Sequence, residues 1–101
     1  MTTETFAKIV DRQIELCRNM LIKKNEEYTN DKSDRFHTFK VAAELTGETQ
    51  MEALAGMMVK HTVSIYDMCK SGDCSLEKWD EKITDHINYL LLLKAMAEEK
   101  L

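Results

Sequence analysis

The sequence predicts an all-α protein, and two observations carry that prediction. The chain of 101 residues contains no proline and three glycines, so few residues interrupt a helix. Apolar residues recur at spacings of three and four along most of the chain, which is the period of an amphipathic helix. We therefore expect a four-helix, up-and-down bundle with one short helix, formed by a single domain over residues 1–101.

The first helix is predicted over residues 3–27. Its start is expected at Thr2 or Thr3, either of which can act as the N-cap. Its apolar stripe consists of Phe6, Val10, Ile14, Cys17 and Leu21. The stripe stops at residues 28–34, which are polar and rich in turn-forming side chains, so the helix is expected to end there.

A short second helix is predicted over residues 36–45, which contain two phenylalanines and a Val-Ala-Ala run. Ser33 or Asp34 is expected to cap its N-terminus, because a short polar side chain can accept hydrogen bonds from the first free N–H groups. Gly47 is expected to end it, because glycine adopts the left-handed conformation that terminates many helices.

The third and fourth helices are predicted over residues 49–70 and 75–100. Thr49 and Glu52 have the spacing of a capping box, in which each side chain accepts a hydrogen bond from the other residue's backbone. A turn is expected at residues 71–73, and Ser75 is expected to cap the last helix.

The predicted last helix has two different faces. Glu81, Asp85 and Asn88 fall within about 60° of one another, because an α-helix turns about 100° per residue. The roughly opposite face carries the apolar residues Trp79, Ile83, Ile87 and Leu90. Residues 90–97 are apolar nearly all the way round, and such a helix end is normally buried on both sides. We therefore expect a homodimer or higher symmetric oligomer built largely on this helix.

Composition disfavours several functions. The net charge is −4 and the basic residues are scattered, which is not the pattern of a protein that binds nucleic acid. The longest apolar run, residues 89–93, is far shorter than the ~18 residues of a membrane span. The N-terminus lacks the features of a signal peptide, and the three cysteines have no zinc-site spacing. We therefore expect a cytoplasmic protein that binds neither nucleic acid nor membranes.

Two groups of acidic residues are candidates for metal binding. Glu81 and Asp85 lie one helical turn apart, and one or two carboxylates suffice to hold Mg²⁺ beside a phosphate. Glu26 and Glu27 stand at a predicted helix C-terminus, where the helix dipole disfavours acids and a cation would stabilise them. The alternative is in each case an ordinary solvated polar surface, with lysines beside Glu81 as ion-pair partners.

Lys60 and His61 are neighbours on the predicted third helix. Lys60 could contact a phosphate or pair with an acid on its own helix. His61 falls in the apolar stripe, so we expect a buried histidine with a hydrogen-bond partner.

Three segments resemble a known group of proteins. They read Lys-Asn-x-Glu-Tyr at residues 24–28, Phe-His-Thr-Phe-Lys-Val-Ala-Ala-Glu-Leu-Thr-Gly at residues 36–47, and Glu-Lys-Ile-Thr-Asp-His-Ile-Asn-Tyr at residues 81–89. Their order is similar to that in small phage and prophage proteins related to the nucleotide-modification-associated domain. That group in turn looks like a branch of the MazG-like all-α nucleoside triphosphate pyrophosphohydrolases. The resemblance covers about residues 20–95.

The resemblance implies an active site and a function. It implies that Glu27, Glu81 and Asp85 are catalytic residues that hold Mg²⁺. The implied substrate-binding residues are Lys24, Asn25, Tyr28, Lys60 and Asn88. The implied reaction is hydrolysis of a nucleoside triphosphate to the monophosphate and pyrophosphate in the cytoplasm of a bacterial host cell.

A second hypothesis follows from departures from the family pattern. The standard pyrophosphohydrolases carry a Glu-x-x-Glu pair on one helix, whereas Glu26 and Glu27 are adjacent and project about 100° apart. The third helix has Lys60 and His61 where related proteins place an acid before a basic residue. A chain with an incomplete acid cluster could instead be a non-catalytic, oligomeric phage protein that binds a nucleotide or a host protein.

Overall fold

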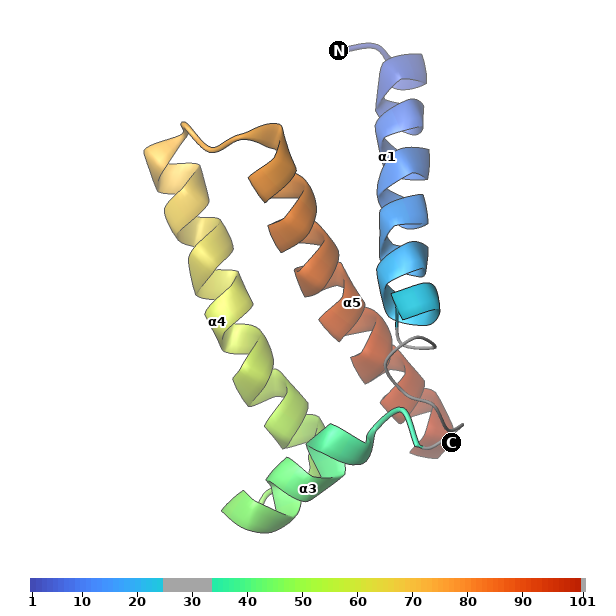
Figure 1. The fold of residues 1–101 in the computed structure, drawn as a ribbon, viewed down its shortest axis with the longest axis vertical. Coiled ribbons are helices and arrows are strands. Elements are labelled where there is room, and N and C mark those ends of the chain that lie inside the picture. Colours follow the sequence, from blue (N-terminus) through green and yellow to red (C-terminus); the bar gives the residue numbers. More distant parts are fainter. Residues whose placement is uncertain (25–33, 101) are drawn as a thin grey trace.

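The computed structural model describes residues 1–24 and 34–100 of the 101-residue chain. Within these residues every regular element is a helix, which confirms the predicted all-α class (Figure 1). The elements are α1 (Thr3–Arg18), the π-helix η1 (Asn19–Lys24), α3 (His37–Thr46), α4 (Gln50–Ser71) and α5 (Leu76–Lys100). In the described part of the chain, no helix is both long and apolar enough to cross a membrane.

α5 is the central helix of the molecule. It runs antiparallel to α4 on one side and alongside α1 on the other. The short helix α3 lies across the N-terminal end of α4 (Figure 1). The chain is elongated, with extents of 45 × 29 × 28 Å. α5 therefore has different neighbours on its two sides.

The local signals at the helix ends are confirmed. Thr2 caps α1 by accepting a hydrogen bond from the Thr5 N–H at 3.1 Å. At the start of α4, Thr49 Oγ1 accepts from the Glu52 N–H and the Glu52 carboxylate accepts from the Thr49 N–H. The Ser75 Oγ accepts from the Lys78 N–H at 3.1 Å at the start of α5. These bonds satisfy N–H groups that the first turn of a helix leaves free.

Two glycines end helices, Gly47 as predicted and Gly72 within the turn predicted at residues 71–73. Gly47 follows α3 with φ of 73°, and Gly72 follows α4 with φ of 70°. Both values lie in the left-handed region, which a residue with a Cβ enters only with strain. The turns after α3 and α4 therefore depend on glycine at these positions.

Asp34 fixes the start of α3. Its carboxylate accepts a hydrogen bond from the Phe36 N–H at 2.9 Å and forms an ion pair with Lys40. The ion pair, followed by the backbone hydrogen bond, lowers the pKa of the Asp34 carboxyl below its ordinary value. The N-cap position itself is Phe36, whose side chain cannot cap, so Asp34 acts from two residues earlier.

The predicted first helix changes geometry before its predicted end at residue 27. Regular α-helix stops at Arg18, and residues 19–24 continue as the wider π-helix η1. A π-helix is rare and often accompanies a functional site. The last residues of the predicted range, Glu27 among them, lie outside the described residues.

The buried core lies where α3, α4 and α5 meet. It consists of Phe36, Phe39, Leu54 and Met96, with Met51, Met57, Tyr89, Leu92 and Leu93 packed against it. Leu54 and Met96 are fully buried. The C-terminal half of α5 is thus buried on one side by its own chain, while Leu90 and Leu91 on its other side stay exposed.

Candidate functional site

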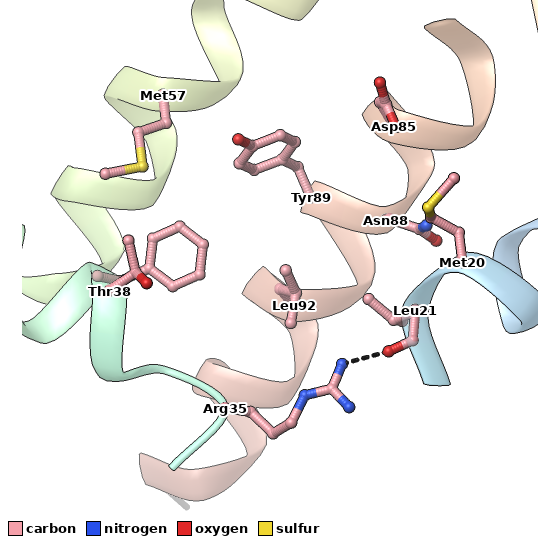
Figure 2. A pocket seen from close by; sticks show the side chains of 10 residues that line it. Met20, Leu21, Arg35, Thr38, Met57, Asp85, Asn88, Tyr89 and Leu92 are labelled. Atoms are coloured by element: carbon pink, nitrogen blue, oxygen red, sulfur yellow. Dashed lines mark hydrogen bonds between the residues drawn. The ribbon is translucent and has the colours of Figure 1, made fainter. Parts of the chain in front are cut away.

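A pocket of about 410 Å³ lies between η1, α3, α4 and α5, and we call it the Asn88 pocket (Figure 2). Its lining residues are Met20, Leu21, Arg35, Thr38, Phe39, Met57, Asp85, Asn88, Tyr89 and Leu92. Most of them are apolar, and a few polar groups converge on the same space. This composition is typical of a small-molecule site.

Asn88 is the buried polar residue of this pocket. The residue is 6% exposed, and its Oδ1 atom has no hydrogen-bond partner among the described residues. Figure 2 shows the side chain between α5 and η1, close to Met20. An unsatisfied buried acceptor costs about 1–3 kcal/mol, so a donor supplied by a ligand would recover that free energy. Asn19 and Gln50 also bury an unpartnered oxygen in the described part of the chain, but neither lines the pocket.

Asp85 lies one turn before Asn88 and is half-buried at the pocket. In the described residues no hydrogen bond or ion pair reaches its carboxylate. Glu81, a further turn back, is exposed, does not line the pocket, and approaches Lys82 at 4.0 Å. The three residues predicted to share one face of the last helix therefore separate, because Asp85 and Asn88 face the pocket and Glu81 faces solvent.

Tyr89 and Met57 line both the Asn88 pocket and a second cavity of about 370 Å³, the Lys60 pocket. Its ring packs edge-on against Phe39 at 6.4 Å between centroids and lies 4.8 Å from the His61 ring. The Lys60 pocket is lined by Ala42, Thr46, Glu48, Ala53, Gly56, Met57, Lys60, His61 and Tyr89. A ligand that contacts both Asp85 and Lys60 would therefore span both pockets, past Tyr89 and Met57.

His61 differs from its prediction. We expected a buried histidine with a hydrogen-bond partner, whereas the ring is half-buried and packs on Tyr89. No hydrogen bond to it is found within residues 1–24 and 34–100. The apolar spacing of α4 correctly indicated that His61 faces other parts of the chain. The ring is only half-buried because it lines the Lys60 pocket.

Arg35 and Leu21 form one side of the Asn88 pocket. The Arg35 guanidinium donates a hydrogen bond to the Leu21 carbonyl at 2.6 Å, which joins the segment before α3 to η1 (Figure 2). A hydrogen bond from a charged donor is stronger than one between neutral groups. The contact therefore holds two segments, distant in sequence, at one side of the cavity.

Several predicted site residues cannot be compared with this geometry. Asn25, Glu27 and Tyr28 lie outside the described residues, as does the side chain of Lys24, the last residue of η1. Among the predicted residues that are described, Asp85 and Asn88 come together, whereas Lys60 lies beyond Tyr89 and Glu81 lies on the surface.

Sequence reasoning did not identify Arg35, Thr38 or Met20 as lining residues. Arg35 and Thr38 flank the start of the short helix, and the sequence contains no signal for which helix they face. The spacing of Asp85, Asn88 and Leu92 on α5 was a usable signal, because residues three and four apart share a helix face.

The acidic residues of α5 partly fit a magnesium site. Within the described residues, no three His, Cys, Asp or Glu side chains are grouped closely enough to hold a metal ion. Mg²⁺ commonly takes one or two protein carboxylates and completes its shell with water and substrate phosphates. Asp85 and Glu81, one turn apart, match that requirement in number and in chemical type, but only Asp85 lines the pocket.

Comparisons with protein-family models, with curated proteins and with solved structures gave no match for this chain.

Proposed function

We propose that this protein binds a nucleoside triphosphate at the Asn88 pocket and hydrolyses it, with Mg²⁺, to the monophosphate and pyrophosphate. The proposal rests on one observation, that Asn88, whose buried Oδ1 atom has no hydrogen-bond partner among the described residues, lines a cavity that Asp85 also lines. Together with the sequence resemblance, this arrangement supports a MazG-like protein of phage type that acts in a bacterial cytoplasm.

The nucleoside part of the ligand suits the chemistry of the pocket. Asn88 Oδ1 is an acceptor, so it favours a ligand that offers N–H or O–H donors. Exocyclic amino groups of bases and hydroxyl groups of sugars are such donors. The Phe39 and Tyr89 rings supply apolar surface for a base, and a volume of about 410 Å³ is within the range of small-molecule sites.

The phosphate part would lie outside this cavity. Asp85 with Glu81, and Glu27 by resemblance, would hold Mg²⁺, which when bound neutralises phosphate charge and polarises the attacking water. Lys60 lies beyond Tyr89 and offers an exposed ammonium group for a phosphate. The chain's own residues would thus bind the base, hold the ion and place a positive charge near the leaving pyrophosphate.

Pyrophosphate release from a panel of ribo- and deoxyribonucleoside triphosphates tests the reaction. We expect release that requires Mg²⁺ or Mn²⁺ and falls at least about 100-fold in Asp85→Asn, because that change removes a metal-binding carboxylate. Asp73→Asn, the same change in the exposed turn after α4, is the matched control and should keep full activity. Full activity in Asp85→Asn would contradict the proposal.

A second candidate is a non-catalytic, oligomeric phage protein that binds a nucleotide or a host protein. It is favoured by the separation of Glu81 from the pocket and by the absence of a third metal-binding side chain near Asp85 in the described residues. Thermal shifts with nucleotides, with and without Mg²⁺, distinguish the candidates. A ligand at 100 times its dissociation constant adds about 2.7 kcal/mol of stability. A shift without metal and without product favours nucleotide binding, and no shift with any nucleotide favours a protein partner.

A further inference from the structure

A polar cavity lies between the C-terminal end of α4 and the N-terminal end of α5, at the end of this helix pair that is remote from α3 (Figure 1). Its volume is about 450 Å³, and we call it the Lys78 pocket. Among the described residues that line it, Met68 is the apolar one, and the others are Ser64, Asp67, Ser71, Cys74, Lys78 and Lys82. It shares no described lining residue with the Asn88 pocket or the Lys60 pocket.

Two lysines place positive charge on the α5 side of the Lys78 pocket. Lys78 and Lys82 lie one helical turn apart, where like charges repel each other. The Lys82 side chain is only 27% exposed, and among the described residues the one carboxylate that approaches it is that of the adjacent Glu81, at 4.0 Å. In the described part of the chain no carboxylate pairs with the Lys78 ammonium group. An anion that contacts both lysines would therefore stabilise them.

The α4 side of the pocket offers groups of another kind. The Asp67 carboxylate lines it but forms no ion pair with a described residue, so it neutralises neither lysine. Ser64 is half-buried, and its hydroxyl has no hydrogen-bond partner among the described residues. Ser71 Oγ donates to the Met68 carbonyl at 3.2 Å and keeps lone pairs that can accept. This side therefore favours a ligand that carries O–H or N–H donors.

The two sides together favour one class of ligand. A bare anion would be attracted by the lysines but repelled by Asp67. A nucleoside base needs apolar surface, which Met68 alone supplies among the described lining residues. A sugar phosphate meets both sides, because its phosphate oxygens accept from ammonium groups and its hydroxyls donate to a carboxylate, as ribose hydroxyls do in dinucleotide sites. A volume of about 450 Å³ is within the range of small-molecule sites.

We propose that the Lys78 pocket binds a small phosphorylated sugar, with Lys78 and Lys82 on the phosphate group and Asp67 on the sugar hydroxyls. The site is separate from the proposed nucleotide site, and it does not depend on nucleotide hydrolysis. Helix α5 thus contributes to two ligand sites, one near its N-terminus and one at the Asn88 pocket.

Titration calorimetry with ribose 5-phosphate tests the proposal, with inorganic phosphate and ribose as comparison ligands. At an ionic strength of about 0.15 M, we expect ribose 5-phosphate to bind with a dissociation constant below about 1 mM. Inorganic phosphate should bind at least about tenfold more weakly, and ribose should give no detectable heat. Absence of ribose 5-phosphate binding, or equal affinity for inorganic phosphate, would overturn the proposal.

A double substitution tests the two lysines. Lys78→Gln with Lys82→Gln should raise the dissociation constant of ribose 5-phosphate at least about tenfold, because it removes both positive charges from the pocket. Lys8→Gln with Lys94→Gln is the matched control, since it changes the net charge equally at two exposed positions that do not line the pocket. The control should keep the wild-type affinity. Equal losses in the two double variants, or full affinity in the first, would overturn the proposal.

Asp67→Ala separates the sugar contact from the phosphate contact. It should weaken the binding of ribose 5-phosphate at least about threefold, because the sugar hydroxyls lose their acceptor. It should strengthen the binding of inorganic phosphate, because a repelling charge is gone. Asp67 is exposed, so the variant should keep its helical circular dichroism, and Asp11→Ala on α1 is the control that should change neither affinity. Changes of the same sign for both ligands, or no change, would overturn the assignment of Asp67 to the sugar.

Discussion

The two sides of α5 differ in how far the chain completes their packing. Toward α3 and α4, α5 contributes to a closed core in which Leu54 and Met96 have no exposed surface. Toward α1, the contact is partly polar, since Gln13 donates a hydrogen bond to Thr84 at 2.8 Å, and apolar grooves remain open beside it. One side of α5 therefore belongs to a core that the chain itself buries, whereas the other side leaves apolar residues exposed in open grooves.

The difference explains where a ligand and where a partner are expected. The closed side leaves a small cavity with a few fixed polar groups, which suits a small molecule. The open side leaves a long apolar face, which suits another helical surface.

Leu54→Ala should be the most destabilising substitution considered. Leu54 is fully buried in the closed core, so its truncation should cost about 2–5 kcal/mol of unfolding free energy. Leu45→Ala, at a position 81% exposed, should cost no more than about 0.5 kcal/mol. Urea unfolding of both variants checks the contrast, and equal costs would show that the core is not where the structure places it.

Asn88→Leu should separate stability from binding. Replacing the unpartnered buried amide with an apolar side chain of similar size should raise stability by about 1 kcal/mol and abolish the nucleotide-induced thermal shift. Gln50→Met is the control, because it removes a similar unpartnered oxygen away from the pocket. The control should keep the nucleotide shift. A stable Asn88→Leu variant with an undiminished nucleotide shift would remove Asn88 from the site.

Thr49→Ala should have a moderate effect confined to folding. It removes the hydroxyl of the capping box at the start of α4, so the unfolding free energy should fall by about 1 kcal/mol. Thr49→Ser keeps an acceptor and should restore most of the loss. Thermal unfolding measures both variants, and equal losses would mean that the cap contributes through packing instead.

Acid should weaken the contact between α1 and α5 slightly. The hydrogen bond from Arg12 lowers the pKa of the Asp80 carboxyl below its ordinary value of 3.8. The ion pair therefore adds stability above pH 3.8, and this contribution is lost as the pH falls through the lowered pKa. Unfolding of the wild type and Asp80→Asn across this range should show their difference shrinking as the pH falls. A difference that does not change with pH would contradict this account.

Local features of the fold were predictable from the sequence, and tertiary ones were not. The capping box of Thr49, the cap at Ser75 and the two terminating glycines depend on residues a few positions apart, and all are confirmed. The change to a π-helix after Arg18 has no such local signal.

The candidate site was predicted in part for the same reason. Asp85 and Asn88 share a helix face, so their common direction followed from spacing alone. Their burial did not, because it depends on η1 and on Arg35, which reaches the Leu21 carbonyl from a distant segment. The apolar stripe of Trp79, Ile83 and Ile87 also followed from spacing, but its position in an open groove beside α1 did not.

The most direct test of the proposed nucleotide site is an amide chemical-shift titration of the ¹⁵N-labelled protein with a nucleoside triphosphate and Mg²⁺. We expect the largest changes at Thr38, Asn88 and Tyr89, around the Asn88 pocket, and small changes at Ile9 and Ile14 in the grooves between α1 and α5. Changes confined to those grooves, or none with any nucleotide, would contradict the proposal that the side of α5 facing α3 and α4 is the nucleotide site.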